Sequence, residues 1–121
     1  MKYLFIYRQV FDQVDLTLVK DEYLYKIIEE TSDTYKVEMI KGDYNPKIFH
    51  KERMPYLANE NYIHIYDTGL NEHVVLAGFI YDDEEKGHEE RKVMIQLDVS
   101  ETMKKEIDKT IKKLNKIKEE L

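Results

Sequence analysis

The triplet Asp67-Thr68-Gly69 matches the core motif of aspartic proteases. In that chemistry an Asp at a strand end shares a proton with a second Asp from another half or subunit, because two adjacent carboxylates cannot both ionise. A dimer of this chain would supply the second Asp. However, Leu70 stands where such enzymes have a small residue, and the apolar-apolar-Gly step at Leu76–Gly78 follows too closely to brace a catalytic loop. We therefore interpret the triplet as a turn between two strands.

The histidines and cysteines indicate no other reaction centre. The four histidines include no pair at helix i,i+4 or strand i,i+2 spacing, so no preformed metal pair is visible. They are His50, His64, His73 and His88. The chain has no cysteine, and we find no phosphate-binding loop, nucleophile elbow or dinucleotide fingerprint. The sequence predicts a protein that is not an enzyme and holds no metal or cofactor.

An acidic run carries six carboxylates within the nine residues from 82 to 90. They belong to Asp82, Asp83, Glu84, Glu85, Glu89 and Glu90. So much charge predicts a solvated hairpin tip, and the run lacks the regular oxygen spacing of a hard-cation loop. Carboxylates can also replace phosphates against the Lys and Arg of a partner. We expect these six residues to bind a partner protein with a basic surface.

Aromatic residues form a second candidate surface. Tyr62, His64 and Tyr66 alternate along one expected strand and share a face. The pairs Tyr62 with Tyr66 and Tyr23 with Tyr25 resemble base-stacking platforms. Such platforms lie in basic grooves, however, and residues 1–99 carry 20 acidic residues against 12 Lys and Arg. We therefore expect no direct nucleic-acid binding.

Length and composition predict the class of protein. The 121 residues, with a net charge of −6, form one domain with a core that needs no disulfides. Its expected parts are a β-rich body at 1–99 and a helix at 100–121. The apolar segment Tyr3–Tyr7 is too short for a signal peptide or a membrane span. We expect a cytoplasmic protein without a membrane partner.

Three apolar runs, at 62–66, 73–81 and 92–97, are rich in β-branched and aromatic residues and predict a meander. The middle run is apolar on both faces, so it should be a central strand. The fold class is α+β, with a mainly antiparallel, curled sheet of about six to eight strands and one long C-terminal helix packed on it. Further strands are expected at 2–8, 14–20, 23–30, 34–41 and 47–50, followed by a helical turn at 51–54.

Residues 16–57 resemble the small SH3-like β-barrel modules of phage and low-GC bacterial proteins. The similarity lies in the spacing Tyr25-x-Ile27, Tyr35-x-Val37 and Phe49-x-Lys51-x-x-Met54. Such modules share no catalytic residues, so the resemblance implies a curled sheet used for binding.

The segment 100–121 has the periodicity of an amphipathic helix. One apolar stripe recurs at spacings of 4, 3, 4, 3 and 4 residues. Its members are Met103, Ile107, Thr110, Leu114, Ile117 and Leu121. We expect the stripe to pack on the sheet, which would make Leu114→Ala cost about 2–5 kcal/mol. The alternative is a coiled-coil contact with a second copy. The lysines between 105 and 116 are interpreted as a solvated face.

These observations favour a non-enzymatic acidic binding protein. The expected function is inhibition of a partner by occupying its basic, nucleic-acid-binding surface, as phage anti-defence proteins of the anti-CRISPR type do. One alternative is an immunity protein against a toxin nuclease. The other is a structural module that dimerises through the C-terminal helix. The expected oligomeric state is therefore a monomer or a homodimer.

Overall fold

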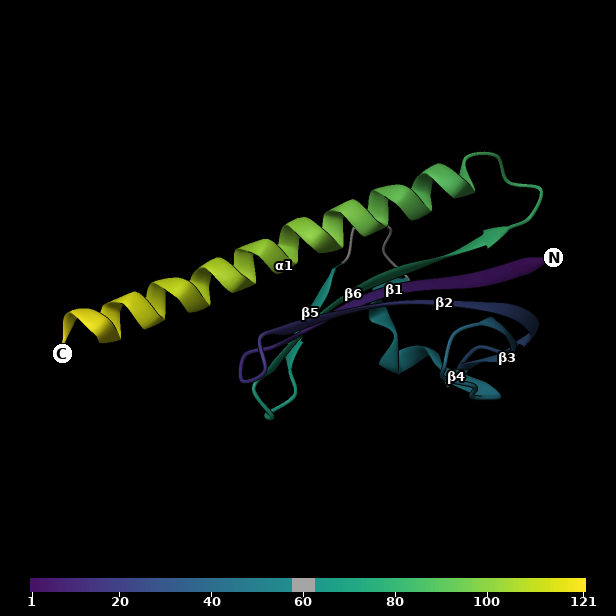
Figure 1. Cartoon of the computed structure of the whole chain (residues 1–121). Coiled ribbons are helices and arrows are strands. Elements are labelled where there is room, and N and C mark those ends of the chain that lie inside the picture. Colours follow the sequence, from purple (N-terminus) through teal and green to yellow (C-terminus); the bar gives the residue numbers. More distant parts are fainter. Residues whose placement is uncertain (58–62) are drawn as a thin grey trace.

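The computed structural model describes residues 1–57 and 63–121. These residues form one antiparallel sheet of order β4-β3-β2-β1-β6-β5 and one long helix, α1 (Figure 1). The predicted α+β class with a curled sheet is confirmed. The strands are β1 (Lys2–Asp12), β2 (Thr17–Glu30), β3 (Thr34–Lys41), β4 (Ile48–His50), β5 (His64–Asp67) and β6 (Glu72–Asp82). The helix α1 spans His88–Glu119, and two short 3-10 turns, η1 (Lys51–Arg53) and η2 (Pro55–Leu57), follow β4.

The central strands β1 and β6 are apolar on both faces and separate two cores. Leu4 and Ile6 of β1 belong to the core on one face, whereas Phe5 and Tyr7 belong to the core on the other. This alternation follows from the two-residue period of a strand. The prediction that segment 73–81 is a central strand covered on both sides is confirmed.

The helix α1 covers one face of the sheet, and β3 and β4 curl toward the opposite face, here called the inner face (Figure 1). On the helix side, Ile95, Val99 and Met103 are buried against β1 and β6. Buried Gln9 joins the two layers, because its amide nitrogen lies 2.8 Å from the Ser100 hydroxyl oxygen.

The inner face is covered in part by η1 and η2, which place buried Met54 and Tyr56 on it. Leu57 packs over Gly78 of β6, where an added Cβ would lie only 3.0 Å from the Leu57 side chain and would also collide with the Phe5 carbonyl oxygen of β1. Gly78 therefore lets the 3-10 segment approach the sheet closely.

The expected strand at 14–20 is wrong in its first half. Residues 13–16 form the turn between β1 and β2, in which the Asp12 carboxylate accepts hydrogen bonds from the amides of Val14 and Asp15. Val14 and Leu16 therefore project from a hairpin tip, and Leu18 is also exposed. From Thr17 the chain continues as one long strand, so the strands expected separately at 14–20 and 23–30 are joined through residues 21 and 22.

The expected strand at 92–97 and the hairpin tip at 82–90 are also wrong, because α1 begins at His88 instead of at residue 100. Ile95, Val99 and Met103 follow at four-residue intervals, so they share one helical face. Val93, Met94 and Leu97 point to solvent. A short apolar run does not by itself separate strand from helix.

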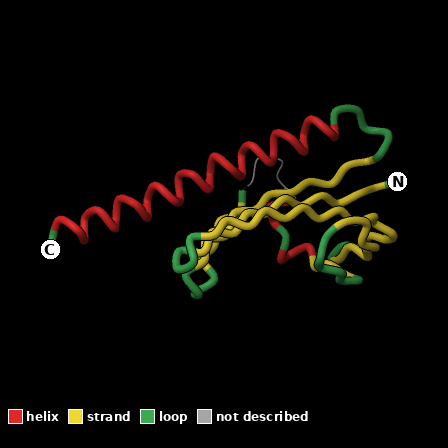
Figure 2. The backbone as a smooth tube through the Cα atoms, in the orientation of Figure 1, coloured by secondary structure: helices red, strands yellow, loops and turns green. Residues whose placement is uncertain are grey.

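The second half of α1 extends beyond the sheet (Figure 2). Along the apolar stripe, Met103 is 1% exposed, whereas Leu114 and Ile117 are 60% and 56% exposed. The prediction that the whole stripe packs on the sheet is therefore wrong, because the sheet is shorter than the helix.

We predict that Met103→Ala lowers the free energy of unfolding by about 2–5 kcal/mol, because it leaves a cavity between α1 and the sheet. The matched change Leu114→Ala, in the exposed part of the same stripe, should alter it by less than about 0.5 kcal/mol. Urea unfolding of dilute protein measures both values. Equal losses for the two variants would contradict the boundary between the covered and uncovered halves of the helix.

Candidate functional site

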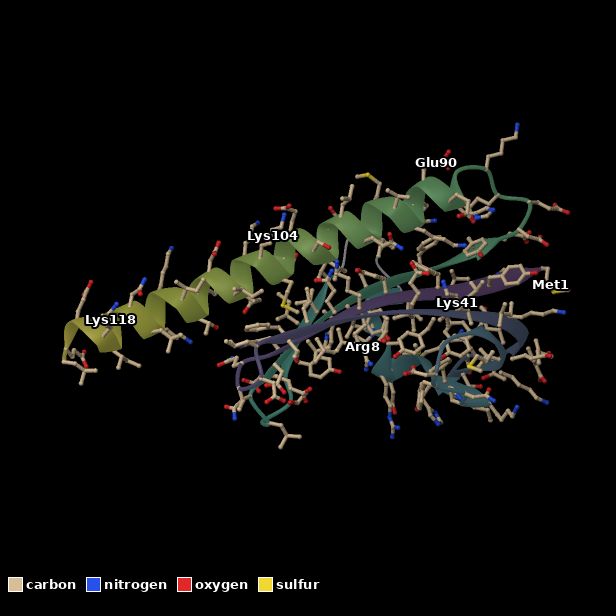
Figure 3. The ribbon with its side chains drawn as sticks, in the orientation of Figure 1. Met1, Arg8, Lys41, Glu90, Lys104 and Lys118 are labelled. Atoms are coloured by element: carbon tan, nitrogen blue, oxygen red, sulfur yellow. The ribbon has the colours of Figure 1, made fainter. Side chains whose placement is uncertain are left out.

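A pocket of about 590 Å³ opens on the inner face of the sheet. Its floor comes from β1, β2 and β6, and its walls come from the β3–β4 loop, β4, the 3-10 turns and β5. Figure 3 shows Arg8 on this side, among ring side chains and away from α1. The lining residues are Ile6, Arg8, Tyr23, Tyr25, Asp43, Tyr44, Phe49, Arg53, Met54, Tyr56, His64, Tyr66 and Leu76.

The tyrosines of β2 hold the pocket wall in place. The Tyr25 hydroxyl donates a 2.6 Å hydrogen bond to the carbonyl oxygen of Tyr44, which ties the β3–β4 loop to the floor. Phe49 contacts the Tyr25 ring edge-on, with 5.0 Å between ring centroids. The pocket is thus built on packed rings, which lose little conformational freedom when a ligand binds.

Burial keeps these phenols neutral. It raises the pKa of Tyr23 to about 12, although the nearby Arg8 charge acts in the opposite direction. Burial likewise raises the pKa of Tyr56 to about 12 and raises that of Tyr25 further. At neutral pH the phenols therefore offer hydroxyl groups and ring faces, and no phenolate nucleophile or base.

The charged side chains of the lining are Arg8, Arg53 and Asp43. The Arg8 guanidinium is 2.7 Å from the Asp21 carboxylate and lies over the Tyr23 ring, 5.5 Å from its centroid. That pairing partly neutralises its charge. Arg53 is exposed at the rim, and among the described residues no carboxylate pairs with it. Arg53 is therefore the cation that a ligand can reach most readily.

The predicted aromatic surface falls in part within this pocket. His64 and Tyr66 of β5 line it, with 5.3 Å between their ring centroids. The His64 ring also lies 6.0 Å from that of Tyr56. Tyr62, the third member of the predicted set, lies outside the described residues.

The acidic run 82–90 forms the turn between β6 and α1 and the first residues of the helix. The N-terminal amine is 3.6 Å from both Asp82 and Asp83. Glu85 lies 3.5 Å from Arg91, and Glu89 lies 3.1 Å from Lys92. The run is solvated, as predicted, but its own chain neutralises much of its charge.

Asp82 also has a structural role. Its carboxylate accepts a 3.1 Å hydrogen bond from the Glu84 amide. This bond and the nearby Asp83 and N-terminal amine lower the pKa of Asp82. The pocket lies on the inner face, so the structure does not bring the acidic run and the aromatic residues into one site.

The Asp-Thr-Gly triplet at 67–69 lies at the β5–β6 turn. The Asp67 carboxylate accepts a 2.7 Å hydrogen bond from the Gly69 amide, and the Thr68 hydroxyl donates one to Glu72. These local hydrogen bonds are typical of a turn, as interpreted from the sequence. Within residues 1–57 and 63–121, no three His, Asp or Glu side chains gather in a way that could hold a metal ion.

A scan of protein-family models and searches of curated proteins and of solved structures found no match to this chain. The resemblance of residues 16–57 to SH3-like modules therefore stays a prediction. In the described part of the chain, α1 is too polar to cross a membrane.

Sequence reasoning missed Arg8, Asp43, Arg53 and Tyr56 as site residues. The side on which Arg8 lies could have been predicted, because Arg8 follows Leu4 and Ile6 on one face of an expected strand. The other three are in loops and 3-10 turns. Their position depends on the curl of β3 and β4 over the sheet.

The raised phenol pKa values predict a loss of stability at alkaline pH. Phenols of the unfolded chain ionise near pH 10, whereas Tyr23 and Tyr56 keep their protons until about pH 12 in the folded protein. The unfolded state therefore binds fewer protons in this interval, and the free energy of unfolding should fall as pH rises from about 10 to about 12. Absorbance of phenolate should show a late-titrating fraction that disappears in urea. A single titration near pH 10 would contradict the burial of these rings.

Proposed function

We propose that this protein is a non-enzymatic binding protein and that the inner-face pocket is its binding site. The observation that carries the proposal is a cavity of about 590 Å³ lined by five tyrosines and two arginines. Its volume lies in the range of about 300–1,000 Å³ typical of small-molecule sites.

The lining favours a small molecule that carries both a flat ring and an anionic group. Tyr66, His64 and Tyr56 present rings on which a planar ligand can stack. Arg53 at the rim can donate paired hydrogen bonds to a carboxylate or a phosphate. A nucleoside monophosphate and an aromatic carboxylic acid share this chemistry, so both serve as probes.

Calorimetric titration of the whole chain with AMP and, separately, with indole-3-acetate tests the proposal. We predict saturable binding of at least one probe. Adenosine or indole, which lack the charge, should bind about 5–20-fold more weakly, and inorganic phosphate, which lacks the ring, should bind more weakly still. The probe that binds more tightly would show whether the pocket prefers a nucleoside monophosphate or an aromatic carboxylic acid.

Two variants locate the binding. Arg53→Gln should weaken binding of the charged probe about 5–20-fold and leave binding of the uncharged ring nearly unchanged. Tyr66→Ala should weaken both. Lys104→Gln, on the exposed side of α1 (Figure 3), is the matched control for loss of a cation. The pocket assignment fails if Arg53→Gln and Lys104→Gln have equal effects, or if no probe binds.

The acidic run is a second candidate surface, for a partner protein with a basic surface. The observation in its favour is that Glu84 and Glu90 are exposed and, among the described residues, have no ion pair. We propose that these two carboxylates form ion pairs with the basic residues of such a partner. This contact suits an inhibitor that covers a nucleic-acid-binding surface, and it also suits an immunity protein against a toxin nuclease. Electrostatic steering would then speed association.

We predict that Glu84→Gln with Glu90→Gln slows association with a basic partner recovered from the native host and flattens its salt dependence. The melting temperature should stay nearly unchanged, because solvated charges contribute little to folding. Asp108→Asn with Glu119→Gln, two exposed carboxylates in the second half of α1, is the control for net charge. If both double variants change the association rate equally, the acidic run is only a solvated turn.

A further inference from the structure

We propose that the uncovered end of α1 pairs with the same segment of a second copy, and that the two helices run antiparallel. The proposal is independent of the pocket, which lies on the inner face. It rests on three observations: where the helix leaves the sheet, how its apolar residues are spaced, and how its charges are placed.

The first observation is the position of the uncovered apolar surface. The helix runs past the tips of the β1–β2 and β5–β6 hairpins (Figure 1). Large apolar side chains are exposed on the helix end and on both tips, and a polar cleft between them is lined by residues of both, including Gln13, Asn71 and Leu114. The exposed apolar residues are Val14, Leu16, Leu70, Ile111, Leu114, Ile117 and Leu121.

The second observation is the spacing of the stripe. Thr110, Leu114, Ile117 and Leu121 alternate at intervals of four and three residues. A 3.5-residue mean period keeps a stripe facing one other helix over its whole length. The stripe begins on the sheet at Met103 and continues unchanged after the sheet ends, so a helical partner can cover the rest.

The third observation is the charge beside the stripe. In a parallel pair, Lys113 of one helix would flank Lys118 of the other, and the two charges would repel. In an antiparallel pair that sets Leu114 opposite Ile117, Lys113 instead flanks Glu120 of the second copy. The two-fold axis repeats this attraction on the other side of the pair.

Neighbouring antiparallel registers lack this match. If the helices overlap by one more heptad, Lys113 of one copy lies beside Lys113 of the other, and Glu106 lies beside Glu120. Both pairs carry like charges and repel. If the helices overlap by one heptad less, Lys118 of one copy lies beside Lys118 of the other, and these charges also repel. The favoured register overlaps residues 110–121, and each helix end then stops near the hairpin tips of the other copy.

The seam is short, so we expect a reversible dimer with micromolar affinity. Sedimentation equilibrium of the whole chain from about 5 to about 500 µM should show a concentration-dependent mass between monomer and dimer. Leu114→Asp should raise the dissociation constant about 100-fold or more, because it places a carboxylate in the apolar seam. Leu97→Asp, at an exposed apolar position over the sheet, should leave it unchanged. Circular dichroism checks that both variants keep the fold.

A charge exchange tests the direction of the helices. Lys113→Glu and Glu120→Lys should each weaken the dimer about 3–10-fold, and the two together should restore it to within about twofold of the original. Lys112→Glu, on the outer side of α1, controls for the change in net charge. A monomer at all concentrations, or a dimer that Leu114→Asp does not weaken, would overturn the proposal. Failure of the double exchange to restore pairing would overturn the antiparallel arrangement.

Discussion

The pairing of β1 with β6 sets two apolar faces back to back, and the rest of the fold covers them. Because side chains alternate along a strand, Leu4 and Ile6 need cover on one face, and Phe5 and Tyr7 need it on the other. The helix supplies the cover on one side. On the other side, the curl of β3 and β4 and the 3-10 turns supply it, so the chain folds as a sheet between two unequal layers.

The inner-face pocket and the exposed stripe of α1 both arise where a covering layer and the sheet differ in extent. On the inner face, β4 and the 3-10 turns are short and leave a ring-lined pocket beside β5. On the other face, α1 is longer than the strands beneath it, so its second half projects with its apolar stripe exposed. The half of α1 that packs on the sheet fixes the direction in which the exposed half projects.

Much of the candidate site could be expected from β-strand alternation, but its full lining could not. Tyr23 and Tyr25, or His64 and Tyr66, must share a face once their segments are strands. That β2 and β5 face one another across a pocket depends on which strands are neighbours in the sheet. Likewise, the acidic run could be recognised from six carboxylates, whereas its pairing with the N-terminal amine, Arg91 and Lys92 depends on the fold.

The sequence by itself determined the α+β class, the two-sided central strand and the amphipathic helix, because each is a local periodicity of apolar residues. Tertiary structure decided where that helix begins and how much of it is covered. The run 92–97 is short enough to suit a strand or a helix, and Val99 and Met103 settle the choice only because β1 and β6 offer them a shared surface. Likewise, Leu114 and Met103 belong to one sequence pattern, and only the length of the sheet makes one exposed and the other buried.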